Sequence, residues 1–226
     1  MTLWTLSDEV LLKRRGILFV VSAPSGTGKT TLVDQLVEET SGLVRSRSYT
    51  SRKPRLQESN QIDYNFITDE EFRGKVKDGL FLEWAEVFGK LYGTSAADVE
   101  AQLTSGSDVV LVIDVQGAHQ VRHSDLNVVT IFILPPSMAV LKDRLSSRDS
   151  LDGDVTDGNQ RLEAARHEVE ASSGYDYIVV NNEYQPCLDR LRSIVIASRS
   201  GVRAMDTQRS SIVATFRLQD ESEADK

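Results

Sequence analysis

A run of small, turn-forming residues that ends in Gly-Lys-Thr constrains the fold of this chain more than any other feature. It covers residues 23–30 and lies between an apolar stretch at residues 17–21 and a segment with helical periodicity. A strand, a glycine-rich turn and a helix in this order are the context that a phosphate-binding P-loop requires. Gly26 and Gly28 let the backbone amides converge on an anion, and the N-terminus of the helix adds partial positive charge. The sequence therefore predicts a site for a nucleoside triphosphate.

The side chains of this loop have separate expected roles. Lys29 reaches the β- and γ-phosphates, and Thr30 ligates Mg²⁺ through its hydroxyl. Ala23 replaces the first glycine of the usual pattern, which is harmless if the backbone angle at this position is one that alanine adopts. The expected ATP-binding residues of the loop are Ala23, Pro24, Ser25, Gly26, Thr27, Gly28, Lys29, Thr30 and Thr31.

Short apolar runs rich in branched residues recur along the chain and alternate with segments of helical periodicity. The strand-like runs after the first are residues 109–113, 128–134 and 177–180. The helix-like segments are residues 30–39, 95–106, 137–145, 160–169 and 186–197. Buried-type strands that alternate with helices predict an α/β fold, with a P-loop NTPase-type parallel sheet flanked by helices.

Residues 45–94 interrupt this alternation and have the pattern of an inserted subdomain. Thr68 and Glu71 match a capping box, which predicts the start of a helix that ends at Gly79. The aromatic and partly alternating residues 80–92 favour antiparallel strands. We therefore expect a mixed, antiparallel subdomain attached to the parallel core.

The remaining segments complete the expected organisation. Residues 146–159 are polar, with two glycines and four aspartates, and predict a short mobile lid. We expect one domain at residues 16–200, divided into a core at 16–44 and 95–200, an insertion at about 45–94 and a lid at about 146–160. Residues 1–15 form an N-terminal extension, and residues 204–226 form a tail that we expect to be disordered from Asp220 onward.

Charge is distributed unevenly along the chain. The formal net charge is −8, which argues against binding of polyanions such as nucleic acids by bulk charge. Residues 45–55, however, contain five basic residues and no acidic residue. A local basic cluster in an acidic protein indicates a small anionic ligand at a defined site.

Other features of the composition exclude whole classes of protein. No stretch approaches the roughly 18 consecutive apolar residues of a membrane helix, and the N-terminus has the reverse of a signal peptide's charge order. Cys187 is the only cysteine, which excludes an internal disulfide framework and a multi-cysteine metal site. We expect a cytoplasmic protein without membrane or nucleic-acid partners, and the choice between monomer and homo-oligomer stays open.

The insertion carries residues suited to a second phosphate and to a purine base. Arg52 and Arg55 lie three residues apart, and their guanidinium groups match the bidentate recognition of a phosphate. Tyr64 and Tyr92 supply hydroxyl donors. Glu83 lies among apolar neighbours, where a carboxylate can accept hydrogen bonds from N1–H and the 2-amino group of guanine, a donor pair that adenine lacks.

With these residues in place, the chain closely resembles guanylate kinase, a family that transfers the γ-phosphoryl group of ATP to GMP. The resemblance covers about residues 16–197. Seven ordered motifs carry it, at residues 22–30, 48–55, 63–66, 81–86, 92–95, 113–117 and 132–137. This ordered set is far more specific than a P-loop alone.

The resemblance implies a role for each site residue. The implied GMP-binding residues are Ser48, Arg52, Arg55, Tyr64, Glu83, Tyr92, Thr94 and Asp114. Within this set, the arginines and tyrosines would hold the phosphate, and Glu83, Thr94 and Ser48 would read the guanine. The implied catalytic residues are Lys29, Arg144, Arg148 and Arg161, with the arginines on or beside the lid. Asn181 would lie near the adenine, and Asp114 would assist Thr30 in holding Mg²⁺ through water.

The sequence departs from the family pattern at two places. Val112 lies where the family usually has an acidic residue that helps bind the guanine amino group. We therefore expect weaker binding of GMP, or replacement of the missing contact by Asp114 or water. Asp149 follows Arg148 where the family favours glycine, and the lid is slightly longer than usual. We expect the lid differences to alter closure more than chemistry.

Two other functions share part of the pattern. A non-catalytic guanylate-kinase-like interaction module would be expected to lack the P-loop lysine or the lid arginines, which are present here. Another small-molecule kinase on the same core, such as a ribose-bisphosphate kinase, would lack the set formed by Ser48, Tyr64, Glu83 and Thr94. Both alternatives therefore rank below a kinase that acts on GMP and, by implication, on dGMP.

Overall fold

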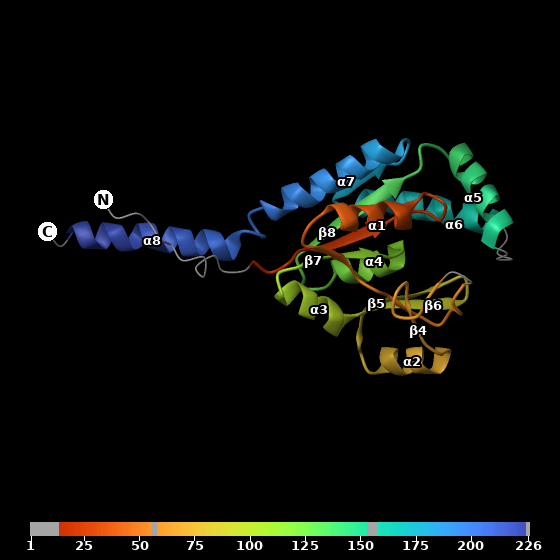
Figure 1. Cartoon of the computed structure of the whole chain (residues 1–226), viewed down its shortest axis with the longest axis horizontal. Helices are drawn as coiled ribbons and strands as arrows, with labels where there is room; N and C mark the ends of the chain where they lie inside the picture. The colour runs from red at the N-terminus through yellow and green to blue at the C-terminus, as the bar shows by residue number, and fades with distance from the viewer. Residues whose placement is uncertain (1–13, 56–57, 153–157, 225–226) are drawn as a thin grey trace.

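A five-stranded parallel sheet forms the centre of the computed structural model, which describes residues 14–55, 58–152 and 158–224 (Figure 1). The strand order is β2-β7-β1-β8-β9, and every neighbouring pair is parallel. The strands are β1 (Leu18–Ser22), β2 (Leu43–Arg45), β7 (Asp108–Val112), β8 (Val128–Leu134) and β9 (Tyr177–Val180). The expected parallel sheet is therefore confirmed.

Helices cover both faces of this sheet, which explains why every residue of β1 is buried. Phe19 and Val21 belong to a core cluster that includes residues of α1 (Lys29–Glu39) and α7 (Tyr184–Arg199). Leu18 and Val20 belong to a cluster with residues of α3 (Ala96–Thr104) and α4 (Val115–Arg122). Because alternate side chains of a strand point to opposite faces, a run without polar residues is what a doubly covered strand requires.

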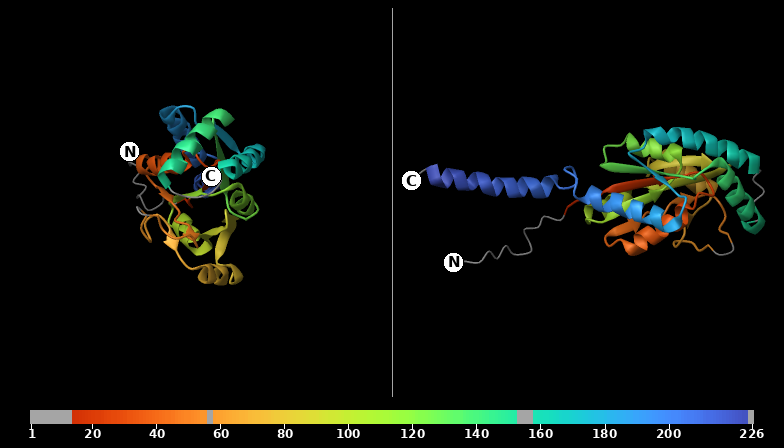
Figure 2. Two further views of the ribbon diagram at one scale, coloured as in Figure 1. Left: turned by 90° about the vertical axis from the view of Figure 1, so that its right-hand side faces the viewer. Right: turned by 90° about the horizontal axis from the view of Figure 1, so that it is seen from above.

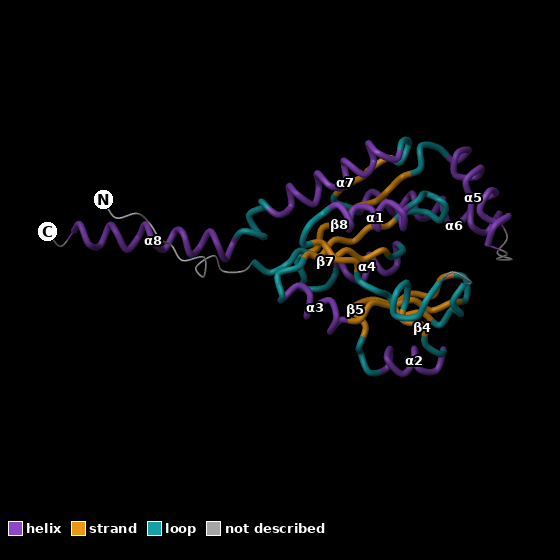
Figure 3. The backbone as a smooth tube through the Cα atoms, in the orientation of Figure 1, coloured by secondary structure: helices purple, strands orange, loops and turns teal. Residues whose placement is uncertain are grey.

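The insertion forms a second sheet of four strands in the order β4-β3-β6-β5 (Figure 3). Its strands are β3 (Tyr49–Thr50), β4 (Asn65–Phe66), β5 (Phe81–Val87) and β6 (Lys90–Ser95). The pairs β5–β6 and β3–β6 are antiparallel, whereas β3–β4 is parallel. The helix α2 (Asp69–Lys77) begins after the capping box of Thr68 and Glu71, as predicted.

Several elements differ from the sequence expectation. The helix α4 was not predicted, although Asp114 caps it; it has only eight residues and contains a glycine, so its periodic signal is weak. The polar segment expected to form the lid continues the helix α5 (Met138–Asp152) before α6 (Gly158–Glu170) and the short 3-10 turn Ala171–Gly174. Residues 153–157 of the expected lid lie outside the described residues.

Two further differences concern exposed elements. The strand β9 was expected to be buried, but it lies at the sheet edge, where Ile178 is 51% exposed and only Val179 is buried. The C-terminal segment, expected to be disordered from Asp220, forms the helix α8 (Asp206–Ala224). This helix projects away from the body (Figure 2), so few packing constraints act on its sequence. Among the described residues, no helix is both long and apolar enough to cross a bilayer.

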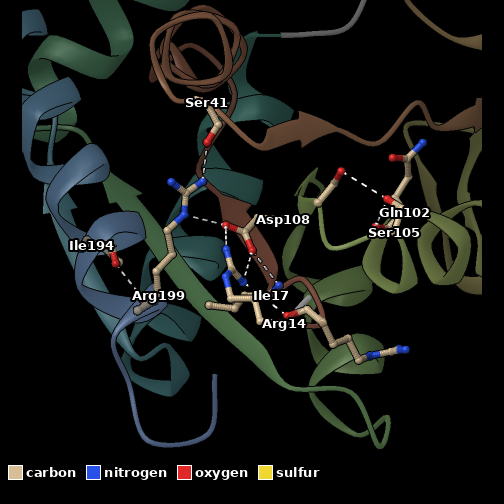
Figure 4. A network of polar contacts seen from close by, with 11 residues as sticks. Arg14, Ile17, Ser41, Gln102, Ser105, Asp108, Ile194 and Arg199 are labelled. Carbon is tan, nitrogen blue, oxygen red and sulfur yellow. Dashed lines mark hydrogen bonds and ion pairs between the residues drawn. The ribbon is translucent and has the colours of Figure 1, made fainter. Parts of the chain in front are cut away.

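A buried ionic network fastens the amino-terminal ends of the central strands (Figure 4). The Asp108 carboxylate has no solvent exposure and accepts hydrogen bonds at 2.8 Å from Arg14, Arg199 and the backbone amide of Ile17. Arg199 also donates to the carbonyl of Ser41 at 2.8 Å. Asp108 therefore ties β7 to the start of β1, to the end of α7 and, through Arg199, to the turn after α1.

We predict that Asp108→Asn lowers the free energy of unfolding at pH 7 by about 3 kcal/mol, because it leaves two partly buried guanidinium groups without their counter-charge. Urea unfolding at pH 7 measures this loss. Burial raises the pKa of Asp108, but hydrogen bonds from Arg14, Ile17 and Arg199 outweigh it and lower the pKa overall. This contribution is therefore present above the unfolded-state pKa and disappears as pH falls through the lower folded-state pKa.

The matched control is Glu100→Gln, which breaks the exposed ion pair with Arg15 (2.5 Å). Exposed pairs contribute little, so this variant should unfold like the parent protein. An equal loss of stability in both variants would contradict the special role of Asp108.

Candidate active site

The P-loop adopts the backbone that its glycines predicted. Gly26 and Gly28 have φ angles of 82° and 88°, and α1 begins directly after Gly28. Among the described residues other than glycine, positive φ occurs only at Gln61 and Phe88, so Ala23 has an angle that alanine adopts readily. The departure from the usual pattern at Ala23 is therefore accommodated.

A second constraint at Gly26 comes from the tertiary structure. A Cβ atom at this position would lie 3.0 Å from a methyl carbon of Leu145, which belongs to α5. Leu141 and Leu145 are buried, so α5 packs directly over the loop. The absence of a side chain at Gly26 therefore serves both the backbone turn and the close approach of α5.

The ammonium group of Lys29 donates to the carbonyl of Ile113 at 3.1 Å. Burial lowers its pKa, while the carboxylates of Glu168 and Asp114 act in the opposite direction. Glu168 was not predicted as a site residue. Burial raises its pKa to about 7, and its Oε2 atom is buried without a hydrogen-bond partner. In the sequence Glu168 is one of several acids on α6, and nothing local distinguishes it.

Thr30 lies at the start of α1, and Asp114 lies two residues after the end of β7, at the N-cap of α4. Asp114 caps α4, accepting from the amide of Gly117 at 2.9 Å and from the side chain of Gln116 at 3.1 Å. With Glu168, these residues offer hydroxyl and carboxylate oxygens, the donors that Mg²⁺ prefers. Within the described parts of the chain, no three His, Cys, Asp or Glu residues gather into a metal site.

Asn181 connects the P-loop to α5. Its buried amide donates to the carbonyl of Thr27 at 2.7 Å, and Arg144 donates to the carbonyl of Asn181 at 3.2 Å. The structure thus brings Arg144 to the loop, and Asn181 supports the loop backbone; contact with adenine stays a prediction. Arg161 is buried on α6. Arg148 belongs to α5, and its side chain lies outside the described residues.

The expected phosphate-binding residues of the insertion are gathered around Arg52. Its guanidinium group lies 5.4 Å from the ring centre of Tyr64 and donates to the hydroxyl of Tyr92 at 3.2 Å. Glu58, which was not predicted, accepts two hydrogen bonds from Arg52 at 2.7 and 2.9 Å and one from the amide of Arg55 at 2.8 Å. Burial opposes the charge of Arg52, but its contacts with Glu58 and Tyr92 raise its pKa overall.

The expected guanine-reading carboxylate is buried beside its expected neighbour. Glu83 is 3% exposed, and the hydroxyl of Thr94 donates to its Oε1 atom at 2.5 Å. Burial raises the pKa of Glu83 to about 7, against the opposing effect of Thr94. Ser48 directly precedes β3, which lies beside β6, the strand of Tyr92 and Thr94. The insertion sheet therefore brings the implied guanine-reading residues onto neighbouring strands.

The structure also shows what surrounds Arg45, the first residue of the basic segment 45–55, and Val112. Arg45 pairs with Asp34 at 2.5 Å and is close enough to Lys29 and Tyr64 to influence the pKa of each. Val112 ends β7 and packs, half-buried, against the core cluster that contains α1 residues.

Comparisons with known proteins show what this chain is similar to. A family model described as guanylate kinase matches residues 15–198. The guanylate kinase of Geobacter metallireducens is 45% identical over 188 residues, which are 83% of this chain and 92% of the relative. That of Neisseria meningitidis serogroup A is 48% identical over 186 residues, 82% of this chain and 90% of the relative. A crystal structure of guanylate kinase from Anaplasma phagocytophilum matches with a TM-score of 0.71 and 34% identity, covering 85% of this chain and 90% of that one.

We predict that Glu83→Gln makes the ligand-free protein more stable at pH 8 than the parent protein. An unfolded glutamate has a pKa of about 4.3, whereas the folded pKa of Glu83 is about 7. The folded carboxyl therefore binds its proton more tightly, and parent stability falls as pH rises through this window. The gain is at most about 4 kcal/mol at pH 8 and vanishes near pH 4.

Urea unfolding of both proteins at pH 4, 6 and 8 measures this difference. Because Glu168 is present in both proteins, its own titration cancels. Stability profiles that run parallel across the three pH values would contradict the prediction.

Proposed function

The chain belongs to the guanylate kinase family, and from this premise we propose how its own residues carry out the ATP-dependent phosphorylation of GMP to GDP. One observation carries the assignment of residues. Lys29 donates to the carbonyl of Ile113 at 3.1 Å, and Gly117, whose amide donates to the next residue, Asp114, at 2.9 Å, lies against the carboxylate of Glu83. The phosphate-binding lysine and the carboxylate of the insertion therefore flank the same end of β7, as the two substrates of a phosphoryl transfer require.

The ATP side of the proposal rests on the P-loop and on α5 and α6. The loop amides and Lys29 hold the β- and γ-phosphates, and Arg144, Arg148 and Arg161 offset charge on the transferring group. The described contact of Arg144 with Asn181 supports this placement, because it brings a guanidinium group to the loop. No general base is needed, since an oxygen of the GMP phosphate already carries negative charge.

On the acceptor side, Arg52, Arg55, Tyr64 and Tyr92 hold the GMP phosphate. Glu58 accepts two hydrogen bonds from Arg52, so it fixes the orientation in which the guanidinium group meets the phosphate. Pre-organisation of this kind lowers the entropic cost of binding.

The base is read by Glu83 with Thr94 and Ser48. The carboxylate accepts from N1–H and the 2-amino group, and these charge-assisted hydrogen bonds favour its ionised form. None of the residues assigned here is given the role of reading the sugar 2′-hydroxyl, so the proposal extends to dGMP as a second substrate.

Mg²⁺ is the cofactor of the proposal, held by Thr30 directly and by Asp114 through water. When bound, the ion neutralises phosphate charge in the transition state. The buried, unpaired oxygen of Glu168 adds an acceptor for water in this region. A cytoplasmic location stays a prediction from the single-cysteine composition.

We predict ADP formation from ATP with GMP and dGMP, and at least a hundredfold lower kcat/KM with AMP or ribose bisphosphate. In the same coupled assay, Lys29→Met should lower kcat by about 10²- to 10³-fold, because it removes a pre-organised charge from the transferring group. Lys77→Met, on the exposed end of α2, is the control and should match the parent protein. Absence of ADP formation with GMP would overturn the assignment.

We further predict that Val112→Asp lowers the KM for GMP by about tenfold and leaves the KM for ATP unchanged. A carboxylate at the end of β7 would supply the acceptor for the guanine amino group that the valine lacks, at the strength of a charged hydrogen bond. Val112→Asn is the uncharged control and should have a smaller effect. An unchanged KM for GMP, with an unchanged preference over AMP, would refute this explanation.

A further inference from the structure

The backbone of α4 touches the carboxylate of Glu83. Gly117 lies in the first turn of this helix, and a Cβ atom there would lie 2.4 Å from Oε2 of Glu83 and 3.1 Å from its carboxyl carbon. Both residues are buried. Glycine weakens a helix interior, so its presence in a helix of eight residues needs a separate reason. The close approach of Glu83 supplies that reason.

One turn further along α4, Gln120 holds the residue that follows Glu83. Its Nε2 atom donates to the carbonyl of Trp84 at 2.7 Å, and its Oε1 atom accepts from the amide of Trp84 at 3.2 Å. The strand β5 is the edge of the insertion sheet. An edge strand has backbone N–H and C=O groups without a neighbouring strand to pair with. The side-chain amide of Gln120 pairs with these groups at Trp84.

The same turn of α4 is fixed to the core from the other side. The amide of Gly117 donates to Asp114 at 2.9 Å, and Asp114 lies two residues after the end of β7. Gly117 therefore contacts two carboxylates, one from the core and one from the insertion. A displacement of α4 would move the support of Glu83 relative to the end of β7.

We propose that Gly117 and Gln120 are positioning residues that set the selectivity for GMP by holding the Glu83 carboxylate in the plane that guanine requires. The inference rests on the proposed guanine-reading role of Glu83. Two hydrogen bonds to N1–H and the 2-amino group need both carboxylate oxygens in place, because hydrogen bonds weaken steeply with angle. Thr94 orients Oε1, the backbone at Gly117 bounds the space of Oε2, and Gln120 fixes the strand from which the side chain extends.

The test compares two glycines that both lie inside helices. In Gly117→Ala the new methyl group displaces Glu83, so the KM for GMP should rise at least tenfold and the preference for GMP over IMP, which lacks the 2-amino group, should fall. The KM for ATP should stay unchanged. Gly74→Ala, in α2 of the same insertion, is the control, because no atom lies within 4 Å of its Cβ position. Both substitutions raise helix propensity, so thermal unfolding of the two variants shows whether the effect is local.

Gln120→Leu tests the second contact without adding volume next to the carboxylate. It removes both hydrogen bonds to Trp84, and the KM for GMP should rise about fivefold with loss of preference over IMP. If Gly117→Ala does not fold, Gln120→Leu tests the proposal by itself. A KM for GMP that is unchanged in every folded variant of the pair would overturn the proposal.

Glu83→Gln, assayed in parallel, separates this inference from the function on which it rests. If this variant keeps the parent KM for GMP and the parent preference over IMP, the guanine-reading role of Glu83 is wrong and the inference falls with it. If Glu83→Gln loses GMP selectivity while Gly117→Ala and Gln120→Leu behave like Gly74→Ala, only the role of α4 is wrong.

Discussion

Several buried ionisable side chains gather near the carboxyl end of β7, and the candidate active site must accommodate their charge. The carbonyl of Ile113 accepts a hydrogen bond from Lys29, and the next residue, Asp114, caps α4. The carboxylates of Glu83 and Glu168 lie close enough to Asp114 for each to have its pKa raised by that neighbour, with burial as the larger cause. Carboxylates brought together in this way disfavour each other's ionised form unless cations offset their charge.

Buried carboxylates are hydrogen-bonded differently at the two ends of the central sheet. At the amino-terminal end, Asp108 is buried with its oxygens fully used by Arg14, Arg199 and Ile17. At the carboxyl end, Glu168 keeps a buried oxygen without a partner, and Glu83 has only part of its hydrogen-bonding capacity filled by Thr94. Protein groups fill the hydrogen-bonding capacity of the carboxylate at the amino-terminal end, whereas the carboxylates at the other end keep acceptor capacity that a ligand can use. Natural proteins commonly depart from full internal satisfaction at functional sites.

Most of the architecture could be predicted from local pattern. Runs of branched residues identified the central strands because burial on both faces leaves no place for polar side chains. The same reasoning failed for α4, α8 and the polar half of α5. In α4 the tertiary contacts of Gly117 and Gln120 decide the structure, and in the exposed helices few apolar contacts are required, so periodicity carries little information. At β9 the edge position permits exposed apolar residues that resemble a buried strand.

The sequence by itself determined the P-loop, because the requirements of the loop are contiguous: a strand, two glycines at positive φ, a lysine and the start of a helix. It also located the arginines and tyrosines of the insertion and the isolated acid Glu83. Only the tertiary structure decided which groups hold these residues. Glu58 beside Arg52 and Gly117 against Glu83 are contacts made by folding, and the residues next to them in the sequence do not indicate them. A backbone conformation is encoded locally by the residues that adopt it, whereas a charge partner or a close approach depends on where distant elements pack.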